Sequence, residues 1–165
     1  MDTSTILMVI VTLALFVVPA IYIQRRQKSK LNIAKQPFIE AANRQGLQLG
    51  EHDFWNEKYG IGLDEANNRL YFWHKEDNDP QETILDLGSV KQSVVENAHR
   101  DVNGNRIIDA VGLRIAFYGA KATSVYLPFY VTKDIMMLKG ELQLAEKWNA
   151  IIQKRIVQTP QAVKV

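Results

Sequence analysis

The chain has 165 residues, a formal net charge of +2 and no cysteine. Without cysteine it can form neither disulfide bridges nor thiolate metal sites, and thiol nucleophiles are excluded. Its length beyond the N-terminal segments suits one globular domain with a sizeable core.

The N-terminal region contains an uncharged apolar run of nineteen residues, Thr5 to Ile23. As a helix rising about 1.5 Å per residue, it would approach the ~30 Å of a bilayer's hydrocarbon core. A cleaved signal peptide carries its positive charge before the apolar run, whereas the only charged residue upstream is Asp2. The pattern predicts a transmembrane helix over residues 5–23, after a short extracytoplasmic N-terminus at 1–4.

A basic linker, residues 24–30, follows the apolar run. Because Lys and Arg near a membrane-spanning end favour the cytoplasmic side, the linker predicts an outside N-terminus and a cytoplasmic C-terminal domain. The same residues could contact anionic lipid head groups, at about 1 kcal/mol each, or serve as a topology signal alone. The candidate membrane-surface residues are Arg25, Arg26, Lys28 and Lys30.

A short juxtamembrane helix is predicted over residues 31–46. Apolar residues recur there at helical spacing, and Gly46 is a natural end. Pro37 either starts this helix or kinks it.

Residues 47–157 are predicted as one sheet domain, because short aromatic and β-branched segments alternate with turn signals. The Asn-Gly pair at 103–104 predicts a tight hairpin turn, and Pro128 places the last strand at an edge or a bulge. The polar run at 75–82 is predicted as a solvated loop. There are six predicted strands, or seven if the region near Val90 bends: 59–63, 69–74, 83–87, 90–99, 107–118 and 123–131.

The last predicted element is an amphipathic helix over residues 141–156. Leu142, Ala145 and Ile152 lie on one apolar stripe, and Trp148 is expected to plug the sheet. Residues 158–165 are a predicted tail. The expected fold class is therefore α+β, mainly β.

This order of strands closed by one C-terminal helix resembles the pleckstrin-homology-like architecture, an antiparallel sandwich capped by a helix. The stretches Glu51 to Phe72, Ile84 to Lys91 and Leu138 to Ile152 are similar to an uncharacterised family of bacterial single-pass membrane proteins. The resemblance implies an anchor, a short helix and this sheet domain, at the bacterial inner (plasma) membrane. It implies no activity, because the family has no catalytic motif to transfer.

Metal sites have little support in the sequence. His52, His74 and His99 lie in separate segments without the HxH or HExxH spacing of zinc sites. The stretch from Asp101 to Asp109 begins like a calcium loop, but Arg106 stands where the sharp turn needs glycine. An ordinary hairpin is the favoured interpretation, and no metal or other cofactor is predicted.

Catalytic and nucleotide motifs are also missing. Gly60-Ile61-Gly62 begins like a dinucleotide fingerprint but lies in a predicted hairpin. The acidic residues Glu76, Asp77 and Asp79 are expected on an exposed loop, where they serve solvation. Residues 31–165 hold 16 Lys and Arg against 17 Asp and Glu, so a nucleic-acid partner is not predicted.

The sequence therefore predicts a non-catalytic, membrane-tethered cytoplasmic module that binds or scaffolds a protein or peptide partner. One alternative is lipid head-group recognition. Against it, the loop expected to join the first two strands, Asp64 to Asn68, carries two acids and no base. The other alternative is a hydrolase built from carboxylates on neighbouring strands.

Overall fold

The computed structural model describes residues 32–76, 79–119, 123–133 and 137–158. The predicted transmembrane helix, the basic linker and residues 159–165 lie outside this description. No helix in the described ranges has the length and apolar character needed to span a bilayer. The chain divides into two compact units, one ending at Gly46 and the other beginning at Leu47.

In the first unit, the helix predicted over residues 31–46 is present at residues 32–44. Phe38, Ala41 and Ala42 are buried, whereas polar residues such as Glu40 and Arg44 are exposed, so the helix is amphipathic. Gly46 has a φ of 71°, a backbone conformation that glycine adopts without a steric cost, so it suits the chain just past the helix end.

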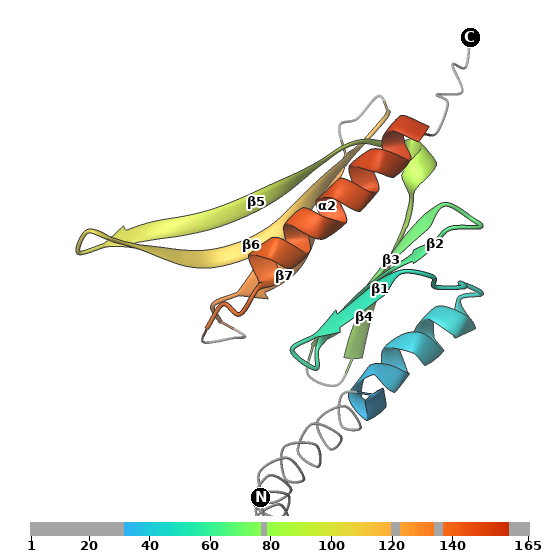
Figure 1. Cartoon of the computed structure of the whole chain (residues 1–165), viewed down its shortest axis with the longest axis horizontal. Coiled ribbons are helices and arrows are strands. Elements are labelled where there is room, and N and C mark those ends of the chain that lie inside the picture. Colours follow the sequence, from blue (N-terminus) through green and yellow to red (C-terminus); the bar gives the residue numbers. More distant parts are fainter. Residues whose placement is uncertain (1–31, 77–78, 120–122, 134–136, 159–165) are drawn as a thin grey trace, which may run out of the picture. The chain divides into compact units, whose positions relative to one another are not determined.

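The second unit contains two antiparallel sheets and a C-terminal helix (Figure 1). The first sheet, in the order β1-β2-β3-β4, consists of β1 (His52–Trp55), β2 (Tyr59–Asp64), β3 (Arg69–Glu76) and β4 (Asp79–Asp86). The second, in the order β5-β6-β7, consists of β5 (Val90–Val102), β6 (Asn105–Phe117) and β7 (Ser124–Val131). A 3-10 turn, η1 (Leu87–Ser89), joins the sheets, and α2 (Glu141–Gln158) closes the unit.

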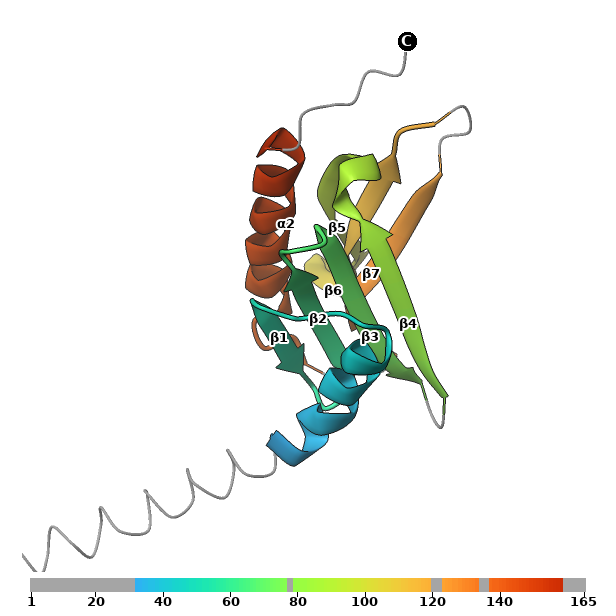
Figure 2. The same ribbon diagram turned by 90° about the vertical axis from the view of Figure 1, so that its right-hand side faces the viewer.

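The core lies between the two sheets and α2, which packs against β5, β6 and β7 (Figure 2). Apolar side chains from every layer are fully buried, among them Ile61 of β2, Leu113 of β6 and Trp148 of α2. The α+β class, mainly β, is thus confirmed, as is the prediction that Trp148 plugs the sheet domain.

The predicted strands and turns mostly hold. All six predicted strands are present, and Asn103 and Gly104 have φ values of 51° and 78°, as a tight hairpin turn requires. Pro128 lies on β7, at the edge of its sheet, beside a register shift opposite Val111 and Gly112. Both features expected from that proline are therefore present.

Two predictions about strands are wrong. The seventh strand is β1, not a bend near Val90, so the loop joining the first two strands is residues 56–58 rather than Asp64 to Asn68. The predicted solvated loop at 75–82 is largely strand, because β4 begins at Asp79. Its first residues are exposed at a sheet edge, where water solvates polar side chains and Pro80 is tolerated.

The turn between β2 and β3 is organised by a buried carboxylate, Asp64. Its oxygens accept hydrogen bonds from the backbone N–H of Asn67 at 3.1 Å, the side-chain amide of Asn67 at 2.8 Å and the backbone N–H of Gln48 at 3.2 Å. The pKa of Asp64 lies below its ordinary value, mainly because the Asn67 side chain donates a hydrogen bond to the carboxylate. Burial alone would raise this pKa, but the hydrogen bonds have the larger effect. Asp64 is therefore a structural acid and not a solvated loop residue.

Asp64→Asn should lower the free energy of unfolding by about 1–3 kcal/mol at pH 7, because the amide cannot accept all three bonds. The lowered pKa means that the carboxylate stabilises the fold above the unfolded pKa near 3.8, and that this stability is lost as the pH falls through the folded value. In urea unfolding of the full chain, the gap between the variant and the parent should therefore narrow as the pH falls below 3.8. Glu146→Gln, at an exposed position, is the control, and a gap that does not narrow as the pH falls would contradict the assignment.

Candidate functional site: the free edge of β5

The longest sheet edge without a strand neighbour in the described residues belongs to β5. This strand has 13 residues and pairs with β6 only. Near its start the Gln153 side chain of α2 donates a hydrogen bond to the backbone carbonyl of Ser93 at 2.6 Å. That carbonyl therefore points away from β6, and by the alternation of a strand the backbone groups of Val95 and Asn97 do the same. The register shift between Ala98 and His99 places its extra residue, Asp109, on β6, so the alternation of β5 continues to His99.

Two buried polar atoms at the junction of β5 and α2 lack a hydrogen-bond partner among the described residues. They are the hydroxyl of Ser93, which is 2% exposed, and the side-chain carbonyl of Asn149, one helical turn before Gln153. Buried polar atoms are normally paired, so this junction keeps unused hydrogen-bonding capacity.

Beyond this junction, β5 and β6 continue as a two-stranded ribbon that projects from the rest of the unit (Figure 1). β7 pairs only with residues 110–116 of β6, and Thr132 adds bonds to Ile108 and Asp109. The ribbon is held by local polar contacts, Arg100 to Asp109 at 3.1 Å and Arg106 to His99 at 3.0 Å. A two-stranded ribbon without a covering layer is only marginally stable in water, so this one has surface to offer a partner.

The other face of the same sheet carries a polar ladder across three strands. Glu96 of β5 accepts a bidentate pair of hydrogen bonds from Arg114 of β6, and the guanidinium lies 5.4 Å from the ring centroid of Tyr126 on β7. The bonds from Arg114 lower the pKa of Glu96. The carboxylate is thus charged at neutral pH and fixed in position beside the β5 edge.

The other edge strands in the described part of the chain, β1, β4 and β7, carry features that disfavour strand addition. β4 has Pro80, β7 has Pro128 and a register shift, and β1 has only four residues. The indole N–H of Trp55, at the end of β1, donates to the Phe129 carbonyl of β7 at 2.9 Å. Between Gln92 and Val102, β5 has neither proline nor lysine, so this edge is left open.

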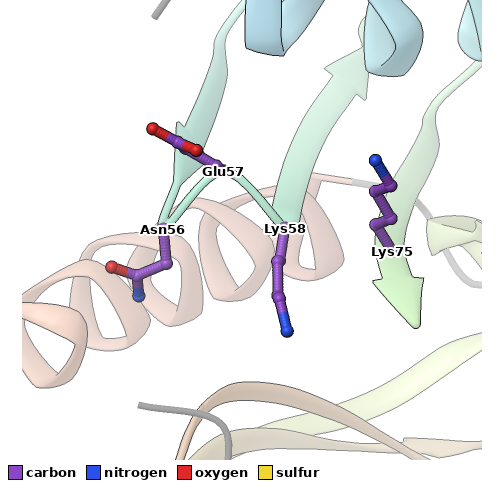
Figure 3. A pocket seen from close by; sticks show the side chains of 4 residues that line it. All are labelled: Asn56, Glu57, Lys58 and Lys75. Carbon is purple, nitrogen blue, oxygen red and sulfur yellow. The ribbon is translucent and has the colours of Figure 1, made fainter. Parts of the chain in front are cut away.

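A second candidate surface lies at the turn between β1 and β2, where a pocket is lined by Asn56, Glu57, Lys58 and Lys75 (Figure 3). Asn56 and Glu57 have φ values of 51° and 56°, uncommon for residues other than glycine. Asn56 is fixed by a hydrogen bond to the buried carboxylate of Glu141 at 2.9 Å. The ammonium groups of Lys58 and Lys75 extend in opposite directions in the figure, so they do not form a convergent anion site.

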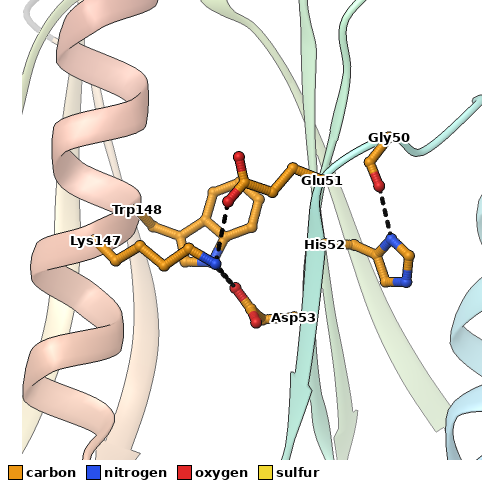
Figure 4. Close-up of polar contacts among 6 residues, drawn as sticks. All are labelled: Gly50, Glu51, His52, Asp53, Lys147 and Trp148. Atoms are coloured by element: carbon orange, nitrogen blue, oxygen red, sulfur yellow. Dashed lines mark hydrogen bonds and ion pairs between the residues drawn. The ribbon is translucent and has the colours of Figure 1, made fainter.

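A third cluster joins β1 to α2 (Figure 4). One carboxylate oxygen of Asp53 accepts from the Lys147 ammonium at 2.7 Å and from the Trp148 indole at 2.8 Å, and Lys147 also reaches Glu51 at 3.1 Å. The hydrogen bond to Asp53 is the main cause that raises the pKa of Lys147. Every charge in this cluster is engaged in holding the helix to the sheet, so its role is structural.

The residues singled out in the sequence are dispersed over the fold. His52 contacts the Gly50 carbonyl at 2.9 Å, His74 stacks on Tyr59, and His99 contacts Arg106 on the ribbon. The stretch from Asp101 to Asp109 is the predicted hairpin, turning at Asn103-Gly104, and Gly60 to Gly62 lie inside β2. The Glu76 carboxylate accepts a hydrogen bond from the Gln81 side chain, and Asp79 is the first residue of β4.

Within the described ranges, no three His, Asp or Glu side chains lie close enough together to hold a metal ion. The predicted membrane-surface residues Arg25, Arg26, Lys28 and Lys30 and the acid Asp77 lie outside the described residues. Comparison with protein-family models, curated proteins and solved structures gave no match.

Sequence reasoning did not single out the β5 edge. It placed a strand there, but the pattern of a strand does not say which of its two sides meets a neighbour. One signal was available, since the other long edges contain Pro80 and Pro128 and this one contains no proline.

Proposed function

We propose that this chain is a non-catalytic, membrane-tethered module that binds an extended segment of a protein partner along the free edge of β5. The open edge carries the proposal, because outward backbone groups can form a further row of sheet hydrogen bonds and the side chains beside them set specificity.

The proposal includes the finer architecture and the cellular address. Four strands, then three strands, then a C-terminal helix is the order of a pleckstrin-homology-like domain, and it is the reason for proposing that fold. The apolar run 5–23 and the basic linker support a single-pass anchor in a bacterial inner membrane with this domain on the cytoplasmic side. Arg25, Arg26, Lys28 and Lys30 would then lie near anionic lipid.

Substitution of proline for Asn97 should abolish binding at this edge, because it removes an outward N–H that a partner strand needs while leaving the β5–β6 ladder in place. The readout is a photoreactive benzoylphenylalanine at position 98 of the full chain, irradiated in intact cells. Discrete protein adducts are expected from this probe, and Asn97→Pro should remove them.

Asn97→Ala is the matched control, since it changes the same side chain and keeps the N–H, so the adducts should persist. A probe on the exposed Lys154 of α2 gives the background. Adducts that are indifferent to Asn97→Pro, or no adducts above the Lys154 background, would overturn the proposed function.

Lipid head-group recognition is the second candidate, favoured by one observation. The loop that joins the first two strands contains Lys58, and Lys75 lines the same pocket. Against it stand the divergent lysine side chains and the opposing charge of Glu57. Lipid adducts from a probe at Lys58, together with no protein adducts from position 98, would favour this alternative.

A further inference from the structure

We infer that the partner at the β5 edge is a second copy of this chain, paired antiparallel with its own β5 about a two-fold axis at Ala98. This inference rests on the proposed function and names the occupant of the same site. Two identical edges can pair in this way because a two-fold axis presents the same surface on both copies.

The backbone favours this register. Because the outward groups lie at Val95, Asn97 and His99, an axis at Ala98 places Asn97 of one copy opposite His99 of the other, and both residues offer their N–H and C=O to the partner. Ala98 then lies opposite Ala98 of the second copy in a non-hydrogen-bonded pair. In such a pair the side chains of the two strands come closest to each other. Ala98 is small and exposed, so the strands can approach there.

The charges favour the same register. An axis at Ala98 places Glu96 opposite Arg100 of the second copy, twice, and opposite charges on directly opposed residues stabilise antiparallel pairs. Shifting the axis to residue 96 or residue 100 would instead place two glutamates or two arginines face to face. The existing pair of Arg100 with Asp109 is largely exposed, at 62% and 37% of the side chains, so rearranging it costs little.

The arrangement also accounts for the projecting ribbon. β5 and β6 extend past β7, so among the described strands only β6 lies beside the distal part of β5, and its other side can meet a second copy. The contact is confined to one strand edge and is small. The proposed anchor compensates, because confinement to one membrane raises the effective concentration of each copy for the other.

Ala98→Cys provides the test, since the chain has no native cysteine. In a non-hydrogen-bonded antiparallel pair the Cα atoms are about 4.5 Å apart, within the range that a disulfide spans. Intact cells that express the full-length variant are treated with diamide, and total protein is separated without reductant. The disulfide-linked dimer should be about tenfold more abundant than for Gln92→Cys, an exposed position on the same strand whose two copies would be about 40 Å apart.

The register is tested by charge. Arg100→Glu or Glu96→Lys, each added to Ala98→Cys, places like charges opposite each other in the homodimer, so each chain alone should lose the disulfide. Co-expressed with tags of different size, the two chains restore opposite charges at both positions, and the mixed disulfide should return. The same yield alone and mixed would overturn the register.

Failure of this inference is distinguishable from failure of the proposed function. If Ala98→Cys gives no dimer above the Gln92→Cys level while the probe at 98 still yields adducts sensitive to Asn97→Pro, the second copy is the wrong partner and the binding edge stands. If the probe gives no such adducts either, both fall.

Discussion

Gly112→Ala should markedly destabilise the second sheet. A Cβ at this position would lie 2.6 Å from the backbone carbonyl oxygen of Leu127 and 2.5 Å from Cζ of Tyr126. The Tyr126 ring can turn aside, but the carbonyl belongs to β7 and cannot move without disrupting the β6–β7 pairing. We expect a loss of about 1–3 kcal/mol or more in the free energy of unfolding, measured by pulse proteolysis of the full chain in urea.

Gly50→Ala is the matched control, because its nearest neighbours lie at 3.8 Å and the change should stay within about 0.5 kcal/mol. Adding Tyr126→Ala to Gly112→Ala should recover only part of the loss, since the clash with Leu127 remains. Full recovery would mean that the tyrosine ring, and not the carbonyl, requires the glycine.

Trp148→Ala should cost about 3–5 kcal/mol of unfolding free energy, the range for truncating a large buried aromatic side chain. The side chain is fully buried at the centre of α2, and its indole N–H donates to Asp53 at 2.8 Å. Its removal opens a cavity in the core and deletes one of the bonds that hold the helix to β1. Pulse proteolysis in urea measures the loss.

Trp148→Phe separates these two contributions, because it keeps most of the apolar volume and removes the donor. It should lose less than the alanine variant, and the exposed Glu146→Ala on the same helix should change little. If phenylalanine and alanine were equally damaging, the hydrogen bond to Asp53 and not the cavity would dominate.

Much of the sheet domain could be predicted from the sequence, because its signals are local. The Asn-Gly turn, the edge position of Pro128 and the apolar stripe of α2 each depend on a few neighbouring residues, and each is present. β1 was missed because its four residues are all half-buried and show no alternation. Its pairing with β2 is fixed by a turn whose Asn56 and Glu57 adopt an uncommon conformation.

The candidate site could not be predicted in the same way, since an edge is a property of the whole sheet. The Val90 to His99 segment was recognised as a strand, but only the β5-β6-β7 order shows that one of its sides lacks a strand among the described residues. The hydrogen bond between Gln153 and Ser93 joins positions 60 residues apart. No local pattern encodes such a contact.

The hydrogen bonds from Asn56 to Glu141 and from Asp53 to Trp148 span 85 and 95 residues of chain. During synthesis, β1 therefore leaves the ribosome long before the helix that secures it. Until α2 emerges, the part of the core that this helix covers stays exposed, and contacts of such long range form slowly. A nascent chain arrested before Glu141 should thus be a substrate for chaperones and proteases, whereas one that has released α2 should be protected.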